Sequence, residues 1–153
     1  MKTILYCTVL LAALLIPKRS TDVGSLCPIE VMMVSYEADR IRIITDTGDL
    51  GEGESVKEAM VNLCDTAAGI VYPDLAEYLI LANCDVTQLQ GIDAWVYPKT
   101  KICKTDTAIE LEGAIEYLNT HEQSVTLRGA MKGAQPEMLI KESGRWMLKN
   151  RKT

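Results

Sequence analysis

The pattern of apolar and polar positions over residues 29–43 predicts a β-hairpin. Residues 29–36 are mostly apolar and predict one strand, residues 37–39 supply a turn, and residues 40–43 alternate between arginine and isoleucine. A period of two places the arginines on one side of the second strand, where we expect them to face water. A further apolar run, residues 76–82, has the length of a strand and no alternation, which is typical of a strand buried on both faces.

Two other segments carry apolar residues at spacings of three and four, which predicts helices. A Ser/Thr-x-x-Glu capping box starts each one, formed by Ser55 with Glu58 and by Thr107 with Glu110. We expect the first helix to end near Gly69, in a left-handed conformation. The expected buried faces are Met60, Leu63, Cys64 and Ala67 in the first helix, and Ile109, Leu111, Ala114, Ile115 and Leu118 in the second.

Three short segments complete the pattern. Residues 83–91 read as a loop or a single helical turn, residues 93–98 as a short strand ended by Pro98, and residues 137–150 as a hairpin turning at Ser143-Gly144. Two helices among about six strands predict an α+β fold, with a small mixed or antiparallel sheet and two packed helices. We expect one such domain over residues 28–153.

The N-terminal segment, residues 1–27, reads as a signal peptide or a short membrane anchor followed by a polar linker. Its residues 3–17 are uncharged and mostly apolar, and Lys2 precedes them. As a helix this run would span roughly 22 Å, less than the ~30 Å hydrocarbon core of a bilayer. The length suits the apolar region of a signal peptide, so we expect an extracytoplasmic protein, secreted or anchored to a membrane. Cleavage, lipidation at Cys27 and retention remain three alternatives.

Charge and cysteine content narrow the class of protein. The net charge is −5, so a broad nucleic-acid-binding surface is not expected. Beyond the apolar run lie four cysteines, which permit three disulfide pairings in an exported domain. Alternatively they are thiols packed in the core of a protein from a reducing cell. These cysteines are Cys27, Cys64, Cys84 and Cys103.

The glycine-rich stretch 46–59 lies where nucleotide-binding proteins place their phosphate loops. Glu54 follows Gly53 where a phosphate loop has lysine, and Asp46, Asp49, Glu52 and Glu54 crowd the turn and would repel an anion. A calcium loop of the EF-hand type is also excluded, because its third and fifth positions would be Gly48 and Leu50. We therefore expect no nucleotide, metal or other cofactor. The interpretation is that Gly51 and Gly53 form a turn and that Ser55 and Glu58 begin the helix.

Catalytic chemistry has little support in the sequence. His121 is the only histidine, and no local motif pairs it with a serine or cysteine nucleophile. We expect a protein that is not an enzyme, with Tyr72, Trp95 and Tyr97 as a candidate surface for a ligand or partner. Two alternatives are a small exported Cys or Ser hydrolase using His121, and a secreted domain that binds a small ligand.

The stretch DRIRIITDTGDLGEGESVKEAMVNLCDTAAGIVYPDLAEYLIL resembles part of the first domain of the spore germinant-receptor C-subunit lipoproteins. The resemblance covers residues 29–104, with residues 93–101 corresponding to the family's next strand. It implies a non-enzymatic role in receptor assembly or signalling at a spore membrane, with protein partners there. The residues that match the family's motif are Gly51, Gly53, Ser55, Glu58, Ala59, Leu63, Tyr72, Tyr78, Leu79 and Ile80.

Overall fold

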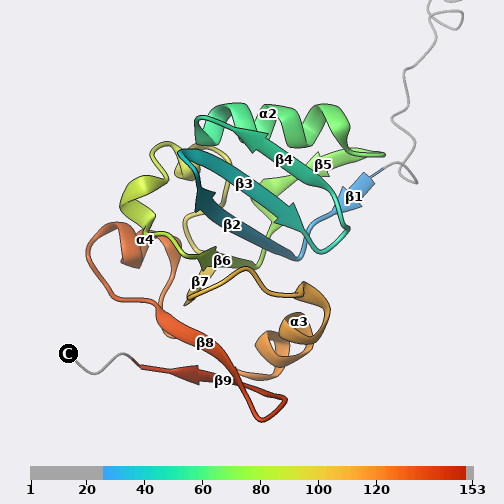
Figure 1. The fold of residues 1–153 in the computed structure, drawn as a ribbon. Helices are drawn as coiled ribbons and strands as arrows, with labels where there is room; N and C mark the ends of the chain where they lie inside the picture. Colours follow the sequence, from blue (N-terminus) through green and yellow to red (C-terminus); the bar gives the residue numbers. More distant parts are fainter. Residues whose placement is uncertain (1–25, 151–153) are drawn as a thin grey trace, which may run out of the picture.

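Seven strands form one mixed sheet in the computed structural model, which describes residues 26–150 (Figure 1). Its central strands are parallel to one another, and an antiparallel hairpin closes the sheet at each side. The fold confirms the predicted α+β class. Across the sheet the strands are β4 (Leu50–Gly53), β3 (Arg40–Thr45), β2 (Val31–Glu37), β6 (Tyr78–Ala82), β7 (Lys101–Thr105), β8 (Glu137–Glu142) and β9 (Arg145–Lys149).

Both predicted hairpins are confirmed, and each turns through two residues with positive φ. Ala38 and Asp39 join β2 to β3 with φ of 49° and 63°, and Ser143 and Gly144 join β8 to β9 with φ of 50° and 79°. Two successive residues with positive φ form the turn type whose twist matches that of the flanking strands. The arginines of β3 are exposed, as the alternation predicts.

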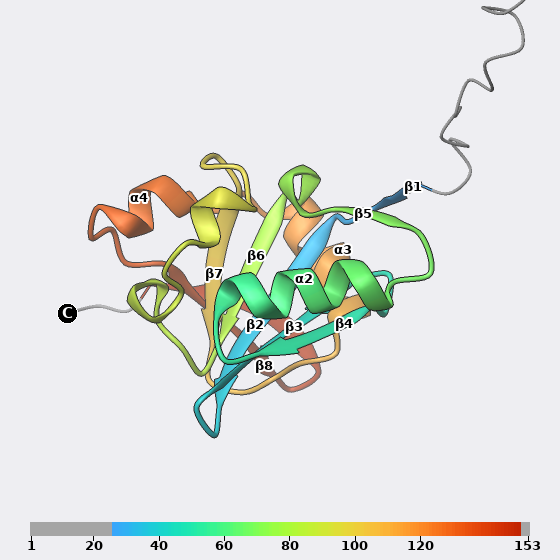
Figure 2. The ribbon, with the colours of Figure 1, turned by 90° about the horizontal axis from the view of Figure 1, so that it is seen from above.

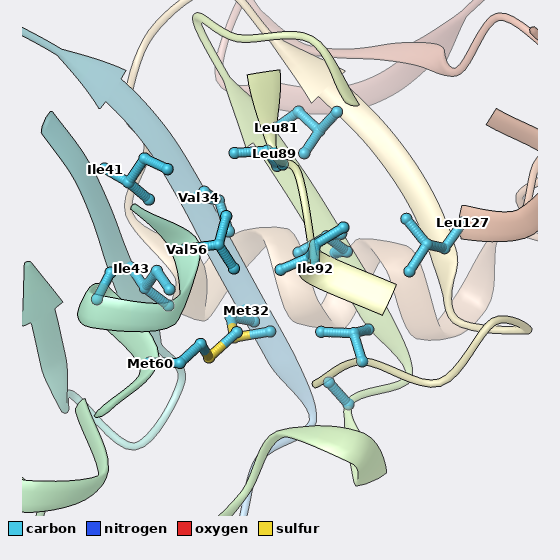
Figure 3. Packing of buried hydrophobic residues seen from close by; sticks show 14 of the residues in the cluster. Met32, Val34, Ile41, Ile43, Val56, Met60, Leu81, Leu89, Ile92 and Leu127 are labelled. Atoms are coloured by element: carbon cyan, nitrogen blue, oxygen red, sulfur yellow. The ribbon is translucent and has the colours of Figure 1, made fainter. Parts of the chain in front are cut away.

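Two core clusters lie on opposite faces of the sheet. Side chains of β2 point to the two faces in turn. Met32 and Val34 belong to one cluster, and Val31 and Met33 belong to the other. This two-sided burial explains why residues 31–34 of β2 and most of β6 form apolar runs without alternation. Figure 3 shows side chains of the first cluster, which helix α2 (Val56–Thr66) covers.

The helices divide between these two faces. Residues of α2 and α4 (Leu127–Met131) belong to the first cluster, and residues of α3 (Leu111–Thr120) belong to the second. The described residues therefore hold three α-helices, where the pattern predicts two. The same part of the chain holds three 3₁₀ turns: η2 (Pro73–Leu75), η3 (Val86–Gln88), which confirms the predicted single turn, and η4 (Ile92–Ala94).

The predicted details of α2 need two corrections. Its buried residues are Val56, Ala59, Met60 and Leu63, whereas Cys64 is exposed. The helix ends at Thr66, with an extended residue following, and Gly69 has no positive φ. At this end, the Thr66 hydroxyl lies near the carbonyls of Asn62 and Leu50.

Helix α3 begins later than the second capping box predicts. The residue before it is Glu110, whose side chain makes no capping hydrogen bond, and Thr107 lies outside the helix. The predicted apolar face is nevertheless confirmed in Leu111, Ala114 and Leu118, which are buried. Packing on the sheet, more than the cap, defines this helix.

The strand predicted over residues 93–98 is wrong. Val96 donates its backbone N–H to the carbonyl of Ile92, as in a helical turn, and the strand follows as β7. Lys101 and Lys104 interrupt the apolar positions of β7, so its pattern does not resemble that of a central strand. Two further short strands, β1 (Leu26–Pro28) and β5 (Ile70–Tyr72), pair in parallel outside the main sheet.

Candidate functional site

The glycine-rich stretch 46–59 forms a turn, an edge strand and a helix start. Gly48 has a φ of 85° and makes the turn between β3 and β4. Gly51 and Gly53 do not form a turn, which corrects the expectation, because both lie within β4. The presence of glycine at positions 51 and 53 therefore needs a different explanation.

That explanation is the close approach of helix α2. A Cβ atom at Gly51 would lie 2.2 Å from the carbonyl oxygen of Ala59 and 2.7 Å from Cβ of Leu63. One at Gly53 would lie 2.5 Å from the backbone nitrogen of Ala59. Both glycines therefore serve helix–strand packing, which no larger residue permits at this spacing.

Ser55 caps helix α2 as predicted. Its hydroxyl oxygen accepts the backbone N–H of Glu58 at 3.2 Å. The carboxylate of Glu58 accepts the N–H of Glu54 at 3.0 Å, one residue before the position that a standard capping box uses. The helix start is thus tied to the end of the strand that precedes it.

A polar ladder joins α2 to the outer edge of β4. Glu58 and Asn62 accept the N–H groups of Glu54 and Glu52, at 3.0 Å each. The Thr66 hydroxyl lies 3.0 Å from the Leu50 carbonyl and 2.8 Å from the Asn62 carbonyl, and shares its proton between them. We call Glu58, Asn62 and Thr66 the edge ladder; their spacing of four residues matches alternate residues of the strand.

The edge ladder disfavours phosphate binding in this stretch. A phosphate loop offers several free backbone N–H groups to the anion. Here the N–H groups of Glu52, Glu54 and Glu58 are already bound by side chains of the protein.

The acidic side chains nearby are also engaged. Asp46 accepts the backbone N–H of Glu30, and Asp49 accepts the hydroxyl of Thr47 at 2.6 Å. Within residues 26–150, no three His, Cys, Asp or Glu side chains gather closely enough to hold a metal ion.

His121 caps the end of helix α3. Its Nδ1 lies 3.0 Å from the carbonyl oxygen of Tyr117 and 2.9 Å from the Thr120 hydroxyl, and its ring stacks on the ring of Tyr117. In the described part of the chain, no serine or cysteine is hydrogen-bonded to it. This arrangement resembles a helix cap more than a catalytic base.

The predicted cysteines fall in different environments. Cys64, Cys84 and Cys103 are free thiols, with Cys84 and Cys103 buried. Burial, with a smaller effect of Asp85, raises the pKa of Cys84 to about 11. Burial, with a smaller effect of Glu137, raises the pKa of Cys103 to about 12, so both stay protonated at neutral pH. Cys27 belongs to β1, but its side chain lies outside the described residues.

The predicted aromatic surface is divided among separate segments. Tyr72 lies in β5, while Trp95 and Tyr97 follow η4. Tyr72 and Tyr97 are exposed, whereas Trp95 packs partly against the first core cluster. No hydrogen bond links these three side chains in the described structure.

A surface hollow of about 360 Å³ lies at the carboxyl ends of β6 and β7. Lys104 and Asp85 form an ion pair in its wall, and Thr87 and Gln135 also line it. Parallel strands bring the residues at their carboxyl ends together, and crevices there often bind ligands. The sequence does not predict these residues, because Lys101 and Lys104 hide the apolar pattern of β7.

The N-terminal segment 1–25 lies outside the described residues, so the predicted apolar run is not seen. Among residues 26–150, no helix has the length and apolar composition needed to cross a bilayer. Three large apolar side chains are exposed in and just after β5, namely Ile70, Tyr72 and Leu75. Of these, only Tyr72 belongs to the predicted aromatic surface, since a three-residue strand gives no clear period.

Comparison of the chain with protein-family models, with curated proteins and with solved structures finds no match.

Proposed function

We propose that this chain is an exported, non-enzymatic binding or assembly module held at a membrane, with a role in spore germination or sporulation. The observation that carries the proposal is the uncharged run of residues 3–17 after Lys2. Residues 18–25 then lead directly to β1, the first strand of the described domain. A folded domain follows the targeting segment after a short polar linker.

Chemistry within the domain favours binding over catalysis. The hydrogen bonds of His121 go to its own helix, and the buried thiols of Cys84 and Cys103 have raised pKa values. The hydrolase alternative makes a distinct prediction, because His121→Ala would abolish a measured activity while the fold stays intact.

The germination or sporulation role depends on the resemblance of residues 29–104 alone. That resemblance also supplies the expectation of protein partners at the membrane. The genes beside this one offer a direct check, since neighbours that act in germination or sporulation would support the role. Neighbours that all belong to an unrelated process would argue against it.

Export can be tested with a reporter that is active only outside the cytoplasm. Residues 1–30 fused to this reporter should give activity in cell envelopes or medium. A matched fusion carrying Leu11→Arg and Leu14→Arg should not, because two charges in the apolar run prevent insertion. An inactive wild-type fusion that accumulates in the cytosol would refute the proposed location.

The hollow at β6 and β7 favours a second function, the binding of a small polar molecule. The side chain of Lys104 is only 15% exposed, and Asp85, Thr87 and Gln135 offer oxygen and amide groups beside it. A ligand should raise the melting temperature of the wild-type protein and not that of Lys104→Met. Equal shifts in both proteins would place the ligand elsewhere.

A further inference from the structure

Three exposed apolar side chains gather in a short stretch around strand β5. Ile70 is 42% exposed, Tyr72 37% and Leu75 57%. Ile70 and Tyr72 point to the same side of β5, while Val71 between them is buried in the core. Leu75 ends the 3₁₀ turn that follows. We call Ile70, Tyr72 and Leu75 the β5 patch.

The β5 patch lies beside the point where the N-terminal segment joins the domain. Strand β1 pairs with β5 in parallel, with Leu26 opposite Ile70 and Pro28 opposite Tyr72. Figure 2 shows this strand pair at one end of the molecule, and α4 at the other. The patch is therefore close to the attachment of the apolar run.

The linker limits how far this end of the domain can lie from a membrane. Eight residues, 18–25, separate the apolar run from β1, and a fully extended chain of that length spans roughly 26–29 Å. With the run in a bilayer, the β5 patch stays within about one domain diameter of the lipid.

The chemistry of the patch suits the boundary between lipid and water. Tyrosine is enriched there because its ring is apolar and its hydroxyl is polar, and isoleucine and leucine enter the acyl boundary. Asp74, which lies between Tyr72 and Leu75 in the sequence, can keep its carboxylate in water. The chain has a net charge of −5, so attraction to anionic lipid does not drive the contact.

We propose that the β5 patch docks on the lipid surface of the membrane that holds the N-terminal run. This inference rests on the proposed membrane attachment, and it adds the orientation of the domain relative to the bilayer. Three side chains alone bind a bilayer weakly, but a tether keeps them at a high local concentration. The domain then stands with β1 and β5 toward the lipid and with α4 away from it.

The test uses the full chain reconstituted in phosphatidylcholine vesicles. An environment-sensitive fluorescent amino acid replaces Leu75 in one sample and, as a matched control, Met131 in another. Met131 is 49% exposed and lies in α4, which Figures 1 and 2 both place at the opposite end from β1 and β5. Vesicle flotation reports attachment, and emission wavelength with iodide quenching reports contact with lipid.

The expected result is flotation of both samples, with a blue shift at position 75 alone. Iodide quenching there should fall by a factor of about two or more relative to position 131. The blue shift at position 75 should change little with the concentration of sodium chloride, because the contact is apolar. The double variant Ile70→Ser, Tyr72→Ser should float normally and reverse the shift of the label at position 75.

The other outcomes separate the two proposals. Flotation without a shift at position 75, or with equal shifts at both positions, overturns the lipid contact and leaves the membrane attachment standing. Failure to float overturns the attachment, and the docking with it. A shift at position 75 that needs no vesicles and rises with protein concentration shows that a second copy covers the patch, which also overturns the lipid contact.

Discussion

The side-chain oxygen of Asn62 in helix α2 accepts the backbone N–H of Glu52 in edge strand β4, at a distance of 3.0 Å. Unpaired backbone groups at the edge of a sheet invite pairing with another chain. Asn62 and the other edge-ladder residues, Glu58 and Thr66, form hydrogen bonds to backbone groups along this edge.

Removal of Asn62 should therefore weaken the fold measurably. Asn62→Ala should lower the free energy of unfolding in urea by about 0.5–1.5 kcal/mol, the net worth of one such hydrogen bond. Asp65→Ala is the control, since Asp65 is exposed on the same helix and forms none of the ladder bonds. Equal effects of the two substitutions would show that the ladder bond adds nothing.

The glycines of β4 should tolerate no side chain. Gly51→Ala should cost about 1–3 kcal/mol or more, because its Cβ would overlap the Ala59 carbonyl and Leu63 and force α2 outward. Gly129→Ala offers a matched control in helix α4, where the nearest atoms to a new Cβ lie at 3.5 Å or beyond. There alanine should be neutral or stabilise by up to about 1 kcal/mol. Thermal melts compare the two, and a neutral Gly51→Ala would contradict the close packing.

Loss of the cap of helix α2 should lower the stability of the protein, and addition of nucleotide should not change it. Ser55→Ala should cost about 0.5–2 kcal/mol. Glu58→Ala should cost a few tenths to about 1 kcal/mol, and the two losses should not add fully, because both residues hold the same helix end. ATP should leave the melting temperature unchanged, since a ligand of the native state would raise it. An ATP-dependent rise that Ser55→Ala abolishes would revive the phosphate loop.

The buried thiols should make the protein sensitive to alkaline pH. The folded state holds the protons of Cys84 and Cys103 beyond the ordinary thiol pKa of 9.0, up to about 11 and about 12. Their contribution to stability is complete below pH 9 and falls as the pH rises, by about 1.4 kcal/mol per pH unit for each thiol. Urea unfolding between pH 9 and 11 should show a shallower decline in Cys103→Ala than in the wild type. Identical slopes would be the contrary result.

Alkylation offers an independent check on the same thiols. At pH 8, mass spectrometry should find label on the exposed Cys64, and on Cys84 and Cys103 only after denaturation. Rapid labelling of Cys103 in the native protein would show that its part of the core opens readily.

The parts of the fold that the sequence predicts are those with local causes. The hairpins at Ala38-Asp39 and Ser143-Gly144 follow from alternation and turn residues, and the cap at Ser55 follows from one side chain and one N–H. Strand β6 is recognisable because both of its faces are buried. Each of these features depends on residues near one another in the chain.

The features that the sequence does not predict depend on contacts between distant segments. Gly51 looks like a turn residue, but its role is set by Ala59 and Leu63 across the helix–strand contact. Lys104 interrupts the pattern of β7, and its side chain forms an ion pair with Asp85, which precedes η3. The β5 patch depends on pairing between β1 and β5, which no periodicity in three residues reveals.

The edge ladder also implies a rule of coupled substitution for proteins built on the same plan. A larger residue at Gly51 or Gly53 would displace α2, and the side chains at positions 58, 62 and 66 would then lose their reach to the strand. Gly-x-Gly and a polar residue at every fourth position of the next helix should therefore change together. This paired motif would identify distant relatives whose remaining residues have diverged.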